Sequence, residues 1–438
     1  MGDTLSAAAT PVDRPFGIWT ASSLVVGLMI GVGIYGLPAQ LAPFGWTSLA
    51  GWAVAAMGTL ACVLALNGLV LARPGEHSLM AMCGAVLGEG VGVAIAWSYW
   101  VSLWCGNAVM ATVIAQYGSS MVRGFQPTPL SIGVIGSAVL LVNSAVNLLG
   151  AREAGRMQVL LTGLKLIPLA AVVVMLAQLA LTPGRHFAGL PLAPLHVEGI
   201  GPAVTLAFFS LLGFECAGMA ADRVHDPARN VVRATLLGMA ATTLVYVTVC
   251  TGLVMALPRG VLEQAPAPFA LLAGQVWGHW AAVSVAVFAA ISGLGAMNAQ
   301  TLLLGEVPLG LVRAGQLPGW VAPVNRFGVA GLPLVLGNGL AIALLLGSAT
   351  ELGAALLAFL LKLTTVVSIF LYLGTCAATW RIGRARGWAA LAILFCLAVI
   401  YGAGLEAGGL GLLLTLAGLP LYALARRIGR RAAQSSLP

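Results

Sequence analysis

Long apolar stretches separated by short polar breaks dominate the pattern of hydrophobic and polar positions along the chain. The stretches are continuous rather than alternating, which excludes a transmembrane β-barrel. A helix that crosses a bilayer needs about 20 mostly apolar residues. A short surface or re-entrant helix is expected over residues 268–276. Breaks at proline, glycine and charged residues predict twelve membrane-spanning helices, over residues 17–38, 46–71, 90–121, 129–149, 158–181, 201–221, 233–257, 280–306, 332–347, 352–378, 388–403 and 410–424.

The composition supports a polytopic helical membrane protein. Of the 438 residues, 60% are apolar and only 8% are Asp, Glu, Lys or Arg, whereas a soluble globular protein carries about 25% charged residues. The charges are also unevenly placed, with none between Arg14 and Arg73 or between Glu89 and Arg123. An ordinary water-soluble domain is therefore excluded, and we expect a lipid bilayer to surround the chain.

The distribution of Lys and Arg predicts the orientation. With the N-terminus in the cytosol, sixteen of these residues fall on cytosolic segments and three, Arg123, Arg185 and Arg259, fall outside. Loops rich in Lys and Arg stay on the cytoplasmic side of a membrane. We therefore expect a multi-pass protein of the cytoplasmic membrane with both termini in the cytosol.

The chemistry-bearing residues argue against most classes of enzyme and nucleic-acid-binding protein. The net charge of +8 comes from basic residues scattered singly or in pairs, without the patch that binds nucleic acid. The seven cysteines and five histidines are dispersed and match no metal-ligand or disulfide spacing. No nucleotide-binding motif and no pore-lining ring of charges occurs. A carrier without a cofactor is therefore favoured over an enzyme, a channel or an ATP-driven pump.

Glycines interrupt two spans at matching positions of the two halves of the chain. The first span carries Gly27, Gly31 and Gly33, and the sixth, five helices later and opposite in direction, carries Gly213. Such pairs point to discontinuous helices in an inverted-repeat transporter. A break in mid-membrane frees backbone groups, which is tolerated only where they line a cavity or bind something. The glycines could equally be close-packing contacts between helices.

Four motifs resemble those of the amino acid–polyamine–organocation (APC) superfamily of permeases. GVGIYGLPA at 31–39 resembles the signature of its first helix, and FFSLLGFE at 208–215 with DPARN at 226–230 is similar to its sixth helix and the following loop. YWVSLWCGNAVM at 99–110 is most similar to the third helix of the basic amino acid/polyamine antiporters, such as the arginine/agmatine antiporter. LKLIP at 164–168 resembles the fifth helix of branches that transport neutral amino acids.

The resemblance covers essentially all twelve spans and implies an all-α, LeuT-like fold. In that fold, helices 1–5 and 6–10 form inverted repeats with helices 1 and 6 broken, and helices 11 and 12 are appended. The chain then divides into a cytosolic tail (1–15), a ten-helix transport core (16–378), helices 11 and 12 (379–425) and a second cytosolic tail (426–438). A homodimer is left open.

The resemblance also implies a substrate site between the unwound parts of helices 1 and 6. Free backbone N–H groups at Gly31, Val32 and Gly33, at the positive end of a half-helix, can hold an α-carboxylate. Carbonyl groups near Phe209 and Leu212 can accept hydrogen bonds from an α-ammonium, and Phe209 corresponds to the aromatic gate of the antiporters.

Departures from the antiporter pattern concern the side chain of the substrate. Asn107 is kept, but Gln300 replaces the tryptophan that packs on arginine, and an amide cannot bind a cation as an aromatic face does. Lys362, near the middle of helix 10, would repel a guanidinium or a polyamine if it faces the pocket and stays protonated. Both points favour a neutral or acidic side chain. The alternative keeps cationic substrates, with Lys362 paired with Glu215 or deprotonated.

Two further buried charges are candidates for coupling, because a charge in mid-membrane costs at least about 2.5 kcal/mol unless it is solvated or paired. Glu215 is interpreted as a proton-responsive carboxylate, or as one that bonds freed backbone groups near the cytosolic vestibule. In related permeases a lysine at the place of Lys165 occupies the sodium position, which argues against sodium coupling. The alternative is a lysine that snorkels to the membrane surface.

These inferences predict a secondary active amino acid transporter, not an enzyme. It would move a small-molecule substrate by sodium-independent exchange or by proton-coupled transport. The alternative is an arginine/agmatine or other basic amino acid/polyamine antiporter, and a channel or membrane-embedded enzyme is the remote alternative.

Overall fold

The structure of the protein is a computed structural model that describes residues 17–31, 33–73, 79–122, 124–149, 154–182, 187–215, 226–348 and 356–435. Its α-helices are α1 (Ile18–Met29), α2 (Gly33–Leu41), α3 (Trp46–Ala72), α4 (Leu79–Leu87), α5 (Glu89–Ser120), α6 (Pro129–Leu148), α7 (Ala154–Leu181), α8 (Ile200–Leu211), α10 (Pro227–Ala256), α11 (Arg259–Glu263), α12 (Pro268–Val276), α13 (His279–Arg313), α14 (Gly331–Ser348), α15 (Leu356–Ile382), α16 (Arg386–Gly402) and α17 (Gly404–Ser435). Single 3₁₀ turns are η1 (Ala42–Phe44), η2 (Val197–Gly199) and η4 (Gly319–Val321).

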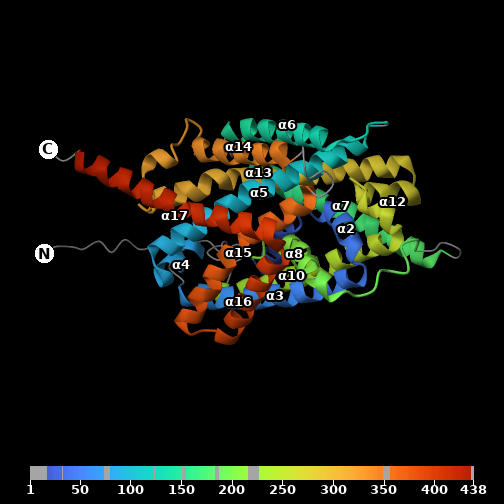
Figure 1. Ribbon diagram of the computed structural model, residues 1–438, viewed down its shortest axis with the longest axis horizontal. Coiled ribbons are helices and arrows are strands. Elements are labelled where there is room, and N and C mark those ends of the chain that lie inside the picture. Colours follow the sequence, from blue (N-terminus) through green and yellow to red (C-terminus); the bar gives the residue numbers. More distant parts are fainter. Residues whose placement is uncertain are drawn as a thin grey trace.

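The described residues form an elongated helical bundle (Figure 1). One end holds α4 and the C-terminal end of α17, and the other holds α2 and α12. Within the described residues, β pairing is limited to an isolated bridge between Val324 and Ala330. The predicted all-helical class is therefore confirmed, whereas the predicted tail at 1–15 lies outside the described residues.

Six of the described helices are individually long and apolar enough to cross a membrane, namely α3, α6, α7, α10, α13 and α15. The adjoining helices α16 and α17 bend by 117° at Ala403 and would count as a seventh if they form one span. The described part of the chain is thus a multi-pass helical membrane protein. The full number of twelve spans stays a prediction.

The first and sixth predicted spans contain breaks. The range 17–38 holds α1 and α2, which are separated by the non-helical residues Ile30 and Gly31. The range 201–221 begins with α8, and the helix gives way to a turn in which Gly213 has a φ of +104°. A residue with that backbone conformation cannot continue a right-handed helix, and glycine adopts it without a steric penalty.

Two other segments compare directly with their predicted boundaries. The short helix predicted over 268–276 is α12, with the same first and last residues. The last helix, α17, continues to Ser435, well beyond residue 424, where the final span was predicted to end. The predicted C-terminal tail therefore begins as an extension of α17, because alanine and arginine favour the helix even after the apolar stretch has ended.

The long helix α5 runs through the middle of the bundle, between α13 and α15 (Figure 1). Two of its indole N–H groups reach the backbones of neighbouring helices. Trp97 Nε1 donates to Leu414 O at 2.8 Å, and Trp100 Nε1 donates to Leu304 O at 3.0 Å. A buried indole needs such an acceptor, because the surrounding medium offers no water. These bonds fix α5 against α17 and α13, and α5 forms one wall of the site described below.

Small residues let α3 approach α8 closely. A Cβ atom added at Gly51 of α3 would lie 2.8 Å from Ala203 Cβ and 3.0 Å from the backbone carbon of Ala203 in α8. Membrane helices use small residues in this way because their association depends on close packing rather than on the hydrophobic effect. The position of α8, whose end borders the site, therefore depends on Gly51.

Replacing Gly51 by alanine is expected to destabilise the protein by about 1–3 kcal/mol, because overpacking forces the two helices apart. The measurement is the thermal unfolding midpoint of the purified protein in detergent. The control is Gly339→Ala in α14, where no heavy atom lies within 4 Å of an added Cβ. That variant should keep or raise the midpoint, because alanine has the higher helix propensity. Equal midpoints in the two variants would contradict the close packing of α3 on α8.

Candidate functional site

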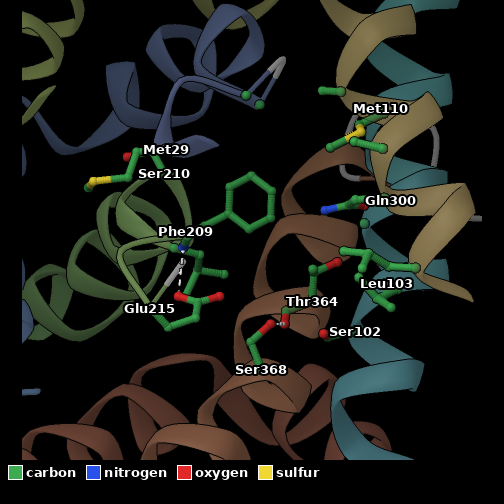
Figure 2. Close-up of a pocket in the computed structure, with 18 of the residues that line it drawn as sticks. Met29, Ser102, Leu103, Met110, Phe209, Ser210, Glu215, Gln300, Thr364 and Ser368 are labelled. Carbon is green, nitrogen blue, oxygen red and sulfur yellow. Dashed lines mark hydrogen bonds between the residues drawn. The ribbon is translucent and has the colours of Figure 1, made fainter. Parts of the chain in front are cut away.

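A cavity of about 160 Å³ lies where α1, α2 and α8 meet α5, α7, α10, α13 and α15 (Figure 2). Its wall is mainly apolar, and among the described lining residues the carboxylate is Glu215 and the ammonium is Lys165. Val32, which was predicted to lie in the site, is outside the described residues. The predicted site residues that line the cavity are Gly31, Gly33, Lys165, Phe209, Leu212, Glu215 and Gln300.

The break between α1 and α2 brings two helix ends to the cavity. The last carbonyl groups of α1 and the first N–H groups of α2 have no partner within their own helices. Gly31 N–H donates to Met29 O at 2.8 Å, and the Tyr246 hydroxyl donates to the same oxygen at 2.9 Å. The predicted free N–H at Gly31 is therefore engaged, and the first turn of α2, from Gly33 onward, supplies the N–H groups that lack helical partners.

The end of α8 faces the start of α2 through Phe209. A Cβ atom added at Gly33 would lie 2.3 Å from Phe209 Cε1, so the ring rests directly against this glycine. Figure 2 shows the ring projecting into the cavity from α8 toward the wall that carries Gln300. Leu212 N–H donates to Phe209 O at 3.3 Å, which closes the last turn of the helix.

Glu215 lies in the turn after α8, and its side chain is only 4% exposed. Its Oε2 atom accepts a hydrogen bond from the Tyr372 hydroxyl at 2.8 Å and another from Gly213 N–H at 3.1 Å. Phe214 stacks on Tyr372 with ring centroids 4.8 Å apart. The carboxylate therefore links the turn after α8 to α15.

Lys165 enters the cavity wall from α7 and is 2% exposed. Its Nζ atom donates to Gly27 O of α1 at 3.4 Å. The backbone carbonyl of Lys165 accepts a hydrogen bond from the Tyr35 hydroxyl of α2 at 2.9 Å. The ammonium is therefore directed at the broken helix rather than at the membrane surface.

Asn107 does not line the cavity. Its side chain is fully buried behind the wall, where Nδ2 donates to Thr301 Oγ1 at 3.0 Å and to Asn338 Oδ1 at 2.8 Å. Its neighbour Gly106 lines the cavity instead. A direct contact between Asn107 and an occupant of the cavity is therefore not part of this arrangement.

Lys362 does not line the cavity either, and its side chain is partly exposed. Its charge interacts with that of Glu406 on α17. Thr364 and Ser368 form the face of α15 that borders the cavity, and a residue two positions before Thr364 lies about 200° away around a helix. The predicted repulsion of cationic substrates by Lys362 therefore has no basis in this arrangement, and Glu215 has its partners elsewhere.

A family model described as amino acid permease matches residues 16–414 of the chain. The chain belongs to the amino acid permease family. The cadaverine/lysine antiporter of Escherichia coli (strain K12) is 27% identical to it over 330 residues, which are 74% of this chain and 72% of that protein. An uncharacterized transporter of Mycobacterium tuberculosis is 28% identical over 322 residues, which are 72% of this chain and 70% of that protein. These matches confirm the resemblance to APC permeases and identify a transporter rather than an enzyme.

Behind the cavity wall, the permease joins α5, α6, α13 and α14 through buried amides. Thr301 Oγ1 accepts hydrogen bonds from the Nδ2 atoms of Asn107 at 3.0 Å, Asn143 at 2.7 Å and Asn338 at 3.4 Å. Asn338 Nδ2 also donates to Ser144 Oγ at 2.7 Å. Side-chain bonds between helices hold the helices in register inside a membrane. Because Thr301 is the shared acceptor, the hydroxyl at this one position connects all four helices.

Several residues that line the cavity could not be named from the sequence. They are the polar residues Ser102 on α5 and Thr364, Ser368 and Tyr372 on α15, together with Gly106 on α5. Within each helix they are spaced by four residues, which places them on a single face. Small or polar residues that recur every four positions inside an otherwise apolar span are the signal that would have found them.

Replacing Thr301 by valine should lower the stability of the permease by about 1–2 kcal/mol, because three buried amide groups lose their common acceptor. The thermal unfolding midpoint in detergent measures this loss. Thr301→Ser keeps the hydroxyl and should restore most of the midpoint. Thr112→Val is the matched control, since the Thr112 hydroxyl donates only to Ala108 O of its own helix. The network has no structural role if Thr301→Val unfolds at the same temperature as this control.

Proposed function

We propose that the permease is a secondary active transporter of amino acids, which works by sodium-independent exchange or proton-coupled transport across the cytoplasmic membrane. The observation that carries the proposal is the meeting of three helix ends at one cavity. They are the C-terminus of α1 at Met29, the N-terminus of α2 at Gly33 and the C-terminus of α8 at Leu211. Helix ends present unbonded backbone groups of both polarities, which suits a zwitterion.

The free N–H groups suit the carboxylate of an α-amino acid, and the free carbonyl groups suit its ammonium. The N-terminus of α2 carries roughly half a positive charge, and its N–H groups, from Gly33 onward, would hold the carboxylate as helix N-termini hold other anions. Carbonyl groups near Phe209 and Leu212 would accept hydrogen bonds from the α-ammonium. This mode of recognition needs no charged side chain.

The two breaks also support an alternating-access cycle. The break between α1 and α2 lies in the first predicted span and the break after α8 lies in the sixth, five spans later, as expected for a LeuT-like pair of inverted five-helix repeats followed by α16 and α17. In transporters of this kind one bundle rocks against the rest around a central site. Phe209, whose ring rests on Gly33, would act as the gate over the substrate. The distribution of Lys and Arg supports an orientation in which both termini lie in the cytosol.

The two buried charges are proposed to serve coupling. Lys165 directs its ammonium at a carbonyl of α1, so a fixed positive charge occupies the place where a coupling cation would bind. Glu215 joins the turn after α8 to α15 through Tyr372. Protonation of Glu215 would weaken its charge-assisted hydrogen bonds. Proton binding would thereby loosen the contact between the turn after α8 and α15.

A second candidate function is exchange of cationic amino acids or diamines. Two observations favour it: the E. coli relative is a cadaverine/lysine antiporter, and the cavity lining contains a carboxylate, Glu215. Uptake of labelled amino acids into proteoliposomes tests both functions, with and without unlabelled counter-substrate inside. Accelerated uptake into preloaded vesicles would establish exchange. Stimulation by an inward proton gradient in empty vesicles would establish proton coupling.

Replacing Gly33 by leucine is expected to abolish substrate binding while leaving the protein folded. The new side chain would displace the Phe209 ring, since even a Cβ atom would lie 2.3 Å from it, and it would cover the first N–H groups of α2. Binding is measured by thermal stabilisation of the purified protein with amino acids. Gly339→Leu, on an exposed face of α14, is the control. Unchanged affinity in Gly33→Leu would refute the proposed placement of the substrate.

Transport is expected to be independent of sodium, because the ammonium of Lys165 takes the position of a coupling cation. Initial uptake rates into proteoliposomes should be the same in sodium and in choline buffers at equal ionic strength and pH. A steep dependence on sodium would mean that the protein holds a cation site other than the one that Lys165 occupies.

A further inference from the structure

The cavity wall opposite Phe209 carries a side-chain amide with an unmet hydrogen bond. Gln300 of α13 lines the cavity, and Figure 2 shows its amide nitrogen directed into the cavity, toward Phe209. Its Oε1 atom is buried and has no hydrogen-bond partner among the described residues. The oxygen lies against Gly106, away from the cavity, so the group that Gln300 offers to a ligand is its amide N–H, a hydrogen-bond donor.

Gly106 provides the seat for this amide. A Cβ atom added at Gly106 of α5 would lie 2.7 Å from Gln300 Oε1 and 3.3 Å from Nε2. The amide therefore rests flat on the glycine, and any larger residue at this position would push it away. The next residue in each helix, Asn107 and Thr301, belongs to the buried amide network, which holds α5 and α13 in register at this point.

Three hydroxyl groups extend the same wall. Ser102 donates to Tyr99 O at 2.7 Å, and Thr364 and Ser368 donate to carbonyl groups of their own helix at 2.8 Å each. Because their hydrogens are used within the helices, these hydroxyls offer acceptor lone pairs to the cavity. Figure 2 shows them on the side of the cavity that Gln300 occupies, across from Glu215.

We propose that Gln300, seated on Gly106, selects the substrate's side chain, and that it favours an uncharged hydrogen-bonding side chain, with a carboxamide as the best fit. This rests on the proposed transport of amino acids. A carboxamide donates two hydrogen bonds to a wall rich in acceptors and accepts one from the amide nitrogen of Gln300. An aliphatic side chain leaves the Gln300 amide unpaired. A cationic side chain would lose its hydration at a wall that carries no carboxylate.

The test compares kcat/KM for labelled glutamine, leucine and lysine, each taken up by proteoliposomes that hold unlabelled counter-substrate. The unmodified permease should prefer glutamine to both. In Gln300→Leu the ratio of glutamine to leucine should fall about tenfold, the effect of one to two lost hydrogen bonds. In Gln300→Glu the ratio of lysine to glutamine should rise. Gln275→Leu makes the same change at an exposed position of α12 and should alter neither ratio.

A double-mutant cycle tests the role of Gly106. Gly106→Ala should lower the ratio of glutamine to leucine by displacing the Gln300 amide. In a Gln300→Ala background the same change should have little further effect on the ratio, because no amide is left to displace. Thermal unfolding provides the second readout: Gln300→Leu should unfold at an equal or higher temperature, since it removes an unpaired polar atom. Additive effects of Gly106→Ala and Gln300→Ala on the ratio would contradict the proposed contact between the Gln300 amide and Gly106.

The outcomes separate this inference from the function on which it rests. The inference fails if the unmodified permease prefers leucine or lysine to glutamine, or if Gln300→Leu leaves the glutamine-to-leucine ratio unchanged. In both cases uptake itself still supports an amino acid transporter. The proposed function fails instead if neither an amino acid nor a diamine is taken up, and the inference fails with it.

Discussion

A backbone polar group inside a membrane must find a partner, and the arrangement of the cavity follows from how this chain meets that constraint. Around the break in the first span, the Lys165 ammonium bonds the Gly27 carbonyl, and the Tyr246 hydroxyl and Gly31 N–H both bond the Met29 carbonyl. The first turn of α2 and the last turn of α8 keep backbone groups without helical partners. An occupant of the cavity therefore meets helix ends as well as the side chains of Lys165 and Glu215.

The same constraint explains most of the buried polar side chains. Glu215 has two donors on one oxygen atom, and the indoles of Trp97 and Trp100 reach carbonyls of neighbouring helices. Thr301 collects amides from three helices into the network behind the wall. Gln300 stands apart from the other buried side chains that have an unpartnered polar atom among the described residues, because it also lines the cavity.

Much of the fold could be predicted from the sequence, because apolar length and charge placement decide where helices lie in a membrane. Glycines and family motifs also indicated the breaks, and seven predicted site residues do line the cavity. The rotation of each helix about its axis could not be predicted. A helix such as α15 carries polar residues on more than one side, Lys362 and Thr365 as well as Thr364, so its apolar pattern alone does not mark the face that turns to the cavity. For that reason Lys362 and Asn107 were expected at the cavity, and Ser102 and Thr364 were not.

The cavity therefore has two walls of different mechanical character. On one side, α5 and α13 are tied to α6 and α14 by side-chain bonds, which resist relative movement of these four helices. On the other side, α1, α2 and α8 end at the cavity, and α8 is joined to α15 beyond its break through the Glu215–Tyr372 contact. Helices that end in mid-membrane can tilt at their breaks without disrupting a continuous backbone ladder. A substrate whose backbone groups bind the ends of α1, α2 and α8, and whose side chain contacts Gln300 on α13, would bridge the two walls. Its side chain would then decide whether movement of the broken helices carries the substrate across the membrane.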